Sequence, residues 1–452
     1  MSDSTLKINN AAYVLTVDAE RRVIRDGTIV IQDGQITNVG KTADLKDLAA
    51  DRVIDASDMV VTPGFLNGHM HISYAHPVRG IFADDVENRL SLVFRMQSVM
   101  TEEEEYLTTL LGLVELLCGG TTTLVDPGTT KFPEACMAAY ELAGCRVVIG
   151  EQVTDVVNPL NLPVYSTSEA IARMNASVER LDGRLGGRMR AWTMPFSLQV
   201  CSPELLIAAK RIADEHDAAM TIHHSGGAGQ PGPTPTQQLA DIGVLGPNTV
   251  LSHAMNLADD DVALLAESGT AVVVCPSTVM KNGANTGAGG RLPDFMDAGI
   301  PVSLATDSAN SSNFLDMVRC MGVAATVYKD ARADPTLVSP QAALELATRT
   351  GAQALQFGDT LGAIEVGRAG DLVLFDSRRP QWRSLTDPVR NLVYSASGDS
   401  VDTVIVGGRV VVEAGRATFL DDEWALIKQV EDVGRRIRSE TGIDFPSPWP
   451  VV

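Results

Sequence analysis

Short apolar stretches separated by polar turns fill the first sixty residues. Residues 11–17 (AAYVLTV) and 27–32 (GTIVIQ) are rich in the β-branched and apolar side chains that strands favour. The second stretch runs into Asp33-Gly34, a hairpin turn signal, and residues 36–39 return from that turn. Two more short apolar stretches follow, at 53–56 and 59–61. The pattern predicts an all-β segment at the start of the chain.

A second set of short strands is predicted near the other end, at residues 370–376, 401–406 and 409–413. Neither end is long enough to build a good sheet core alone. We therefore expect residues 1–60 and 365–420 to pair into one small β-sandwich domain, with the middle of the chain inserted between them. Two unrelated β-rich tails are the alternative.

The middle of the chain alternates apolar strands with helical stretches, which is typical of a parallel α/β architecture. One helix is easily placed after Thr101, because Thr101 and Glu104 form a capping box and Gly119-Gly120 ends it. Eight strand candidates predict a (β/α)8 TIM-type barrel over residues 61–364, in which chemistry sits at the carboxyl ends of the strands. They lie at 60–67, 121–126, 146–150, 189–195, 219–223, 249–253, 271–275 and 301–307. A charged helix over 421–438 opens a C-terminal segment, 421–452.

Composition narrows the class of protein. Of the 452 residues, 45% are hydrophobic, ample for a large core, and the formal charge of −21 argues against nucleic acid and anionic membranes as partners. The six cysteines form no CxxC pair and are expected to be reduced and mostly buried. The first residues lack the apolar core of a signal peptide, and no apolar run is long enough to span a bilayer. These features predict a cytoplasmic protein.

Histidines gather at the predicted strand ends. His69 and His71 are two residues apart after the first strand, so they can face the same side and share a metal ion. An HxH pair alone more often means two ordinary histidines. However, His223, His253 and Asp307 end the fifth, sixth and eighth predicted strands. Packing alone rarely places so many ligand-type side chains at the same end of one sheet, so we expect a metal site.

Over nearly its whole length the sequence resembles the amidohydrolase superfamily. The resemblance is to the mononuclear branch of cytosine- and guanine-type deaminases, triazine hydrolases, and phenylurea and thiocarbamate hydrolases. Residues 63–71 (PGFLNGHMH) match the family's first-strand motif. Further matches follow in family order at 79–80, 84–85, 120–123, 201–206, 252–253, 275–277, 305–308 and 367–373.

The resemblance implies one divalent metal held by His69, His71, His223 and Asp307. Zinc is the first expectation, with iron or cobalt as alternatives. Residues 194–196 (MPF) stand where binuclear members carry a bridging lysine, which favours a single metal. In the implied chemistry Asp307 accepts a proton from the activated water and His253 orients that water or polarises the bond under attack. Family analogy also implies a homo-oligomer.

Two positions depart from the deaminase pattern. Deaminases of this branch carry a glutamate three residues after the fifth-strand histidine, and here that residue is Gly226. They also often carry a substrate-binding histidine after the fourth-strand proline, where this chain has Phe196. A glycine cannot transfer a proton to departing ammonia.

These departures lead us to expect hydrolysis of a non-peptide C–N bond in a small aromatic or heterocyclic molecule, such as an amide, urea, carbamate or triazine. The alternative is deamination of a nucleobase-like or aminotriazine heterocycle, with His224, His76 or Glu151 replacing the missing acid. A second alternative is a metal-binding relative without turnover. Substrate contacts are predicted from position alone at Phe196, Phe82, Tyr74, His76, His224 and Met280. The glycine-rich stretch 283–290 is predicted to be a mobile loop near the mouth of the site.

Overall fold

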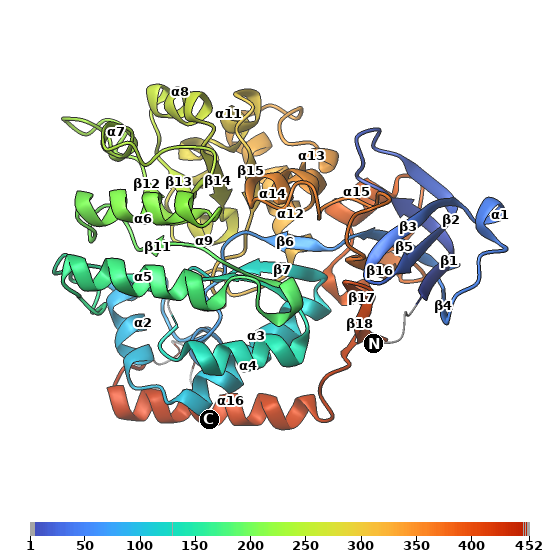
Figure 1. Ribbon diagram of the computed structural model, residues 1–452, viewed down its shortest axis with the longest axis horizontal. Coiled ribbons are helices and arrows are strands. Elements are labelled where there is room, and N and C mark those ends of the chain that lie inside the picture. The colour runs from blue at the N-terminus through green and yellow to red at the C-terminus, as the bar shows by residue number, and fades with distance from the viewer. Residues whose placement is uncertain (1–4, 129, 446, 448, 450–452) are drawn as a thin grey trace.

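The computed structural model describes residues 5–128, 130–445, 447 and 449. Both ends of the chain join one nine-stranded sheet, seen at the right of Figure 1. Eight of its strands follow the order β19 (Arg416–Ala417), β18 (Arg409–Glu413), β17 (Val401–Val406), β16 (Leu372–Asp376), β5 (Met59–Pro63), β1 (Thr5–Leu15), β2 (Val23–Gln32) and β3 (Gln35–Lys41), and β4 (Arg52–Asp55) pairs with β1.

The two chain ends meet where β16 pairs antiparallel with β5, with Leu374 opposite Val61. The strands β2 and β3 form the hairpin predicted at Asp33-Gly34, and both turn residues have a positive φ, as a tight hairpin turn requires. The structure thus contains the expected pairing of the chain ends. The sandwich form and the domain limits stay predictions.

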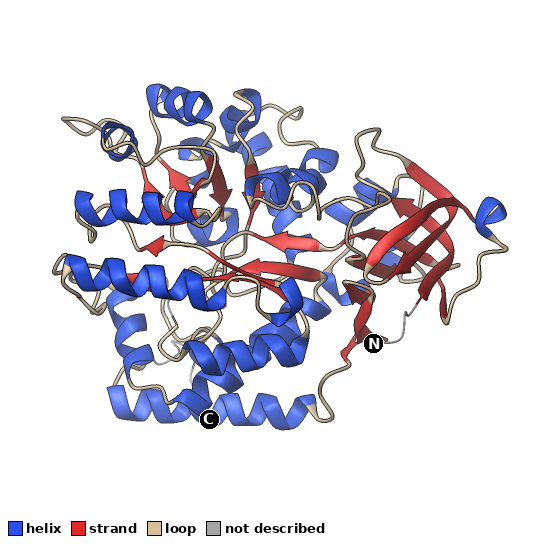
Figure 2. Cartoon of the chain, in the orientation of Figure 1, coloured by secondary structure: helices blue, strands red, loops and turns tan. Residues whose placement is uncertain are grey.

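Eight parallel strands form two four-stranded sheets in the rest of the chain, with helices on their outer sides (Figure 2). One sheet holds β6 (Phe65–Asn67), β7 (Thr121–Val125), β8 (Arg146–Ile149) and β10 (Met189–Ala191). The other holds β12 (Met220–Ser225), β13 (Thr249–Met255), β14 (Ala271–Val274) and β15 (Val302–Leu304). A short pair, β9 (Gln152–Val153) and β11 (Met194–Pro195), extends β8 and β10.

Backbone hydrogen bonds connect the two parallel sheets at both sides. The Thr193 amide donates to the Ala219 carbonyl at 3.1 Å, and on the opposite side the Gly68 amide donates to the Leu304 carbonyl at 3.1 Å. The predicted parallel α/β architecture is therefore confirmed, and the arrangement is consistent with a TIM-type barrel.

Two sequence predictions need correction. The first strand, expected over 60–67, is two strands, because the chain leaves the nine-stranded sheet at Gly64 and enters β6 at Phe65. Gly64 lies so close to β7 that a Cβ there would be 2.2 Å from the Thr122 Oγ1 atom. The stretch 283–290 is not a plain loop, since residues within it form the short helix α10 (Thr286–Gly289).

The predicted capping box is present in α3 (Glu102–Cys118), and the predicted terminal helix is α16 (Glu423–Thr441), which packs against α3 and α2. The remaining α-helices are α1 (Thr42–Leu45), α2 (Arg89–Ser98), α4 (Pro133–Ala143), α5 (Thr167–Leu181), α6 (Pro203–Glu215), α7 (Pro235–Asp241), α8 (Asp259–Ser268), α9 (Pro276–Lys281), α11 (Leu292–Asp297), α12 (Met317–Arg332), α13 (Pro340–Leu346), α14 (Arg349–Ala354) and α15 (Pro388–Tyr394). Short 3₁₀ helices are η1 (His76–Val78), η2 (Leu185–Gly187), η3 (Pro380–Trp382) and η4 (Gly398–Ser400).

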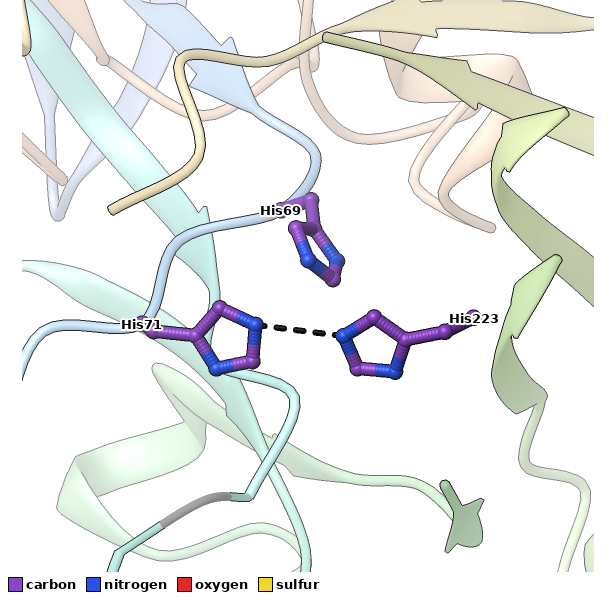
Figure 3. Close-up of side chains that lie close together, drawn as sticks. All are labelled: His69, His71 and His223. Atoms are coloured by element: carbon purple, nitrogen blue, oxygen red, sulfur yellow. Dashed lines mark hydrogen bonds between the residues drawn. The ribbon is translucent and has the colours of Figure 1, made fainter. Parts of the chain in front are cut away.

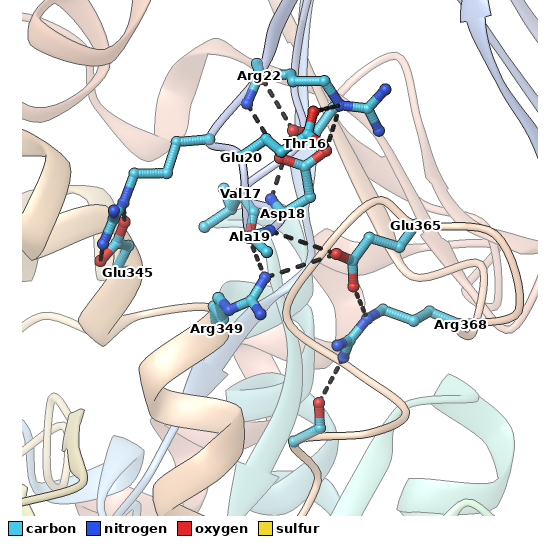
Figure 4. A network of polar contacts seen from close by, with 12 residues as sticks. Thr16, Val17, Asp18, Ala19, Glu20, Arg22, Glu345, Arg349, Glu365 and Arg368 are labelled. Atoms are coloured by element: carbon cyan, nitrogen blue, oxygen red, sulfur yellow. Dashed lines mark hydrogen bonds and ion pairs between the residues drawn. The ribbon is translucent and has the colours of Figure 1, made fainter.

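A polar network joins the nine-stranded sheet to the helices that cover the parallel strands (Figure 4). Glu365 accepts a hydrogen bond from the Ala19 amide at 3.4 Å and pairs with Arg368 at 2.5 Å and with Arg349 at 3.6 Å. Arg349 begins α14 and also donates to the Val17 carbonyl at 3.4 Å. These contacts fix the turn after β1 against α14.

All six cysteines are free and five are buried, which confirms the expectation of unpaired, mostly buried thiols. Within the described part of the chain, no helix is long and apolar enough to cross a membrane.

Candidate metal centre

Three histidines converge at the carboxyl ends of β6 and β12 (Figure 3). The Nε2 atoms of His71 and His223 lie 3.1 Å apart, and the ring of His69 lies 4.8 Å, centroid to centroid, from each of the other two rings. One ligand atom from each histidine falls within 4.8 Å of the others. Among the described residues, these three histidines are close enough together to hold one metal ion.

The chemistry of this group fits a divalent metal. His69 is fully buried, yet neither of its ring nitrogens has a hydrogen-bond partner among the described residues. Such orphaned polar atoms are rare in native proteins unless a ligand or ion satisfies them. Burial, together with the neighbouring His223 and His71, lowers the pKa of His69 well below its ordinary value, so the ring is neutral and can act as a ligand.

The tautomer of His223 is set by the strand beside it. The Nδ1–H group donates to the carbonyl of Phe196 at 3.0 Å, which leaves the Nε2 lone pair directed toward His71. Burial and the adjacent His253 lower the pKa of His223 to about 3, so the ring is neutral at pH 7. A backbone carbonyl that holds a histidine in this way is the usual support of a metal ligand.

His253 and Asp307 lie next to the three histidines. The ring of His253 is 4.8 Å from that of His69 and 5.6 Å from that of His223. The Asp307 amide donates to the His69 carbonyl at 3.1 Å, and its carboxylate accepts from the Ser308 amide at 2.6 Å. Asp307 is not part of the compact three-histidine group, so its predicted role as fourth ligand stays a prediction.

The backbone at these two residues has an uncommon conformation. His253 has φ of 74° and Asp307 has φ of 60°, and β12 and β13 shift register between His224 and Ser225. Positive φ values at non-glycine residues cluster at functional sites, because the surrounding structure must hold them there. Burial raises the pKa of Asp307, while the positive form of His253 opposes that rise.

Aromatic rings line one side of the histidines. Phe196 stacks on His223 with centroids 4.4 Å apart and an interplanar angle of 19°. Phe94, on α2, lies 6.1 Å from Phe196 and 6.2 Å from Tyr74, and Tyr74 lies 6.0 Å from His71. Phe196 and Tyr74 were predicted from the sequence. Phe94 was missed, because no motif surrounds it and only the position of α2 places it here.

The other side chains that were predicted to contact the substrate pack against other parts of the protein or are exposed. Phe82 packs against Phe445, 5.6 Å between centroids, and Met280 is exposed on α9. His76 is buried beside Glu115, with 3.0 Å between Nε2 and the carboxylate, and His224 contacts the Thr236 hydroxyl at 2.9 Å. Glu151 pairs with Arg173. The three side chains considered as substitutes for the missing acid, His224, His76 and Glu151, therefore have partners outside the three-histidine group.

Gly226 cannot be replaced by a glutamate without moving the backbone. Its amide donates to the Met255 carbonyl at 2.7 Å, and a Cβ atom at this position would lie 2.3 Å from the Asn256 carbonyl oxygen. The strand end thus packs against the segment after β13. The backbone at this position therefore leaves no space for the deaminase glutamate. The difference from the deaminases involves the backbone as well as the side chain.

Glu115 on α3 connects the two segments that follow His71 and Asp307. Its carboxylate accepts from Arg79 at 2.6 Å, from His76 at 3.0 Å and from the Leu315 amide at 3.3 Å. Burial opposes ionisation, but these hydrogen bonds and the charge of Arg79 outweigh it and lower the pKa of Glu115 to about 2.

Glu115→Gln is expected to lower the free energy of unfolding at pH 7 by roughly 1–3 kcal/mol, because charge-assisted hydrogen bonds are lost. A depressed carboxylate pKa adds stability that is present above the ordinary value of 4.5 and is lost as the pH falls toward 2. In urea denaturation, the difference in unfolding free energy between wild type and variant should therefore become smaller as the pH falls from 5 to 3, because protonation of Glu115 removes the charge that stabilises the folded chain. A constant difference would contradict this role. Glu215→Gln, in an exposed pair with Arg211, is the control.

Known proteins are similar to this chain over most of its length. Residues 60–411 match the amidohydrolase family. The chain is 32% identical over 436 residues to the 5-methylthioadenosine/S-adenosylhomocysteine deaminase of Syntrophobacter fumaroxidans, which covers 94% of this chain and 95% of that protein. It is 33% identical over 416 residues to the 5'-deoxyadenosine deaminase of Methanothermobacter thermautotrophicus, covering 89% and 93%.

Solved structures are also similar. An adenosine deaminase from Xanthomonas campestris with bound zinc matches with a TM-score of 0.86 at 27% identity, covering 96% of this chain and 98% of that one. The atrazine chlorohydrolase of Arthrobacter aurescens TC1, complexed with zinc, matches with a TM-score of 0.84 at 22% identity, covering 95% and 100%, which shows the shared fold. The chain therefore belongs to the amidohydrolase family, in its mononuclear-metal branch, and is a hydrolase that acts on carbon–nitrogen bonds other than peptide bonds.

Proposed function

We propose that this enzyme hydrolyses a C–N bond of a small aromatic or heterocyclic molecule and releases an amine, using a divalent metal held by His69, His71 and His223. The observation that carries the proposal is the buried His69 ring, whose two nitrogens lack partners among the described residues while two further imidazoles converge on it. When bound there, a divalent metal lowers the pKa of water to about 7 and polarises the bond under attack.

The residues around the metal ligands have separate roles in the proposed reaction. Asp307 accepts the proton of the attacking water, since its buried carboxylate follows the strand end beside His69 and burial raises its pKa. The ring of His253 lies 4.8 Å, centroid to centroid, from that of His69, and His253 orients the water or polarises the substrate. Phe196, Phe94 and Tyr74 exclude water and stack on the planar part of the substrate. Asp307 also serves as a metal ligand in this proposal.

The amine can be ammonia or a larger group. The names of the related deaminases favour ammonia, and so they support the alternative from the sequence analysis better than the preferred reading. One observation supports the larger amine. Gly226 has no room for the usual glutamate, and His224, His76 and Glu151 are engaged with other partners. An arylamine, such as that of a phenylurea, is a weaker base than ammonia and therefore depends less on proton transfer as it leaves.

Product analysis separates the two reactions. The chain, loaded with zinc, is incubated with adenosine-type nucleosides and aminotriazines on one side, and with aryl ureas, carbamates and anilides on the other. Ammonia from the first set establishes deamination, and an arylamine from the second set establishes the other reaction. Failure to release any amine from either set contradicts the proposed function.

Further parts of the proposal follow family membership. Zinc is the proposed metal, because two structural neighbours carry it. The strands β6 to β15 are proposed to close into a (β/α)8 barrel over residues 61–364, with residues 1–60 and 365–420 forming the β-sandwich and 421–452 a terminal segment. We also propose that the enzyme is cytoplasmic, forms a homo-oligomer and acts on a small molecule. Foreign aromatic compounds are one proposed class of substrates.

A further inference from the structure

A large pocket lies at the end of the parallel strands opposite the histidines. Its volume is about 780 Å³, and it is bordered by Arg146, Arg188 and Arg409, with Phe357 on another wall. Arg146 begins β8 and Arg188 directly precedes β10, so both arginines stand at the amino ends of their strands. The three histidines stand at the carboxyl ends, and the pocket is therefore separate from the metal centre.

Arg146, Arg188 and Arg409 all border this pocket, together with Arg190, which pairs with Asp182 at 3.0 Å. A Cβ atom on Gly144, in the turn before β8, would lie 3.2 Å from Nη1 of Arg409, and one on Gly407 would lie 3.3 Å from Nη2 of Arg146. Burial lowers the pKa of Arg188, and the positive charges of Arg146 and Arg409 lower it further, while Cys145 and Glu141 oppose the change. The structure therefore brings like charges together where no catalytic role requires them.

The charges in the pocket are only partly balanced. Arg146 forms two hydrogen bonds with Asp371, at 2.8 and 2.9 Å. Neither Arg188 nor Arg409 forms an ion pair within residues 5–128 and 130–445, and the buried Nε atom of Arg188 lacks a hydrogen-bond partner there. Asp33 and Asp359, the acids that border the pocket, are exposed and are not paired with these arginines. An unpaired buried donor and an excess of positive charge are unusual in a chain of net charge −21.

We propose that this pocket binds the phosphate group of a small phosphorylated molecule. Several guanidinium groups from different strands suit an anion with three or more oxygens, whereas a carboxylate is satisfied by one bidentate arginine. The volume leaves room for an organic group, which packs against Phe357. Binding at this end, far from the metal, makes it a second ligand site of the enzyme.

Isothermal titration of the full zinc-loaded chain with inorganic phosphate and with phenyl phosphate, at constant ionic strength, tests the proposal. We expect saturable binding of both, with phenyl phosphate tighter, and at least about tenfold weaker binding in Arg409→Gln and in Arg188→Gln. Arg409 is exposed, so Arg409→Gln is expected to fold even if Arg188→Gln does not.

Two controls give the result a clear meaning. Arg211→Gln, on the exposed face of α6, removes the same charge elsewhere and should leave phosphate affinity unchanged. Phosphate can also bind a metal ion, but the arginine variants keep all seven histidines, so a loss of binding in them locates the site in the pocket. No phosphate binding by the wild type, or equal affinity in wild type and Arg409→Gln, would overturn the proposal.

Discussion

Replacing His71 with alanine is expected to abolish metal binding and to reduce hydrolysis by at least about a thousandfold, because only two of the three imidazoles that hold the metal remain. His71 Nε2 faces His223 Nε2 across 3.1 Å, the distance at which one ion contacts both rings. Metal content per chain, measured by elemental analysis after gel filtration, should fall from about one to near zero.

His216→Ala is the matched control, because it makes the same change at the end of α6, where the ring of His216 contacts the Asn175 side chain at 3.2 Å. It should keep both metal and activity. Retention of a full metal equivalent by His71→Ala would show that the metal lies elsewhere.

Asp307→Asn is expected to lower kcat by about a hundredfold to ten-thousandfold, with a smaller change in metal content than His71→Ala causes. Asparagine keeps the shape of the side chain but cannot accept the proton of the attacking water. Asp307 is buried beside His253 and His69, with its amide bound to the His69 carbonyl at 3.1 Å. Steady-state kinetics with the substrate identified by product analysis measures the effect.

Asp18→Asn provides the control, since Asp18 is also buried but pairs with Arg22 in the turn between β1 and β2. That variant should lose stability and keep its kcat. If Asp307→Asn retained wild-type kcat, another base would have to accept the proton. If it instead lost the metal as completely as His71→Ala, Asp307 would act chiefly as a ligand.

The metal centre was accessible to sequence reasoning because its signal is local and periodic. His69 and His71 carry an i, i+2 spacing, and His223 ends an apolar strand, so strand alternation and the strand-end rule place all three together. The capping box of α3 and the hairpin at Asp33-Gly34 were likewise predictable, because each depends on residues close together in the sequence.

The features that sequence reasoning missed depend on distant contacts. Phe94 reaches the site only because α2 lies beside Phe196. Glu115 accepts a hydrogen bond from Leu315, which is 200 residues away from it in the sequence. The segment 283–290 was predicted as a loop from its glycines, yet residues within it form a helical turn, α10, packed against α12. Tertiary packing overrides local propensity in such cases.

Sequence also could not decide what replaces the missing deaminase glutamate. From spacing alone, His224 remained a candidate shuttle, although strand alternation pointed it away from His223. The structure shows His224 against Thr236 and shows Gly226 closely packed against the Asn256 carbonyl. Gly226 also follows the register shift between β12 and β13, which no local pattern reports.

The most direct test of the central claim is a zinc titration of the chelator-treated chain, with amine release measured at each step. We predict no hydrolysis without metal, a linear rise in activity with added zinc, and saturation at about one zinc per chain, as expected for one site built by His69, His71 and His223. Activity that persists without metal, or that saturates only at two equivalents, would contradict the account.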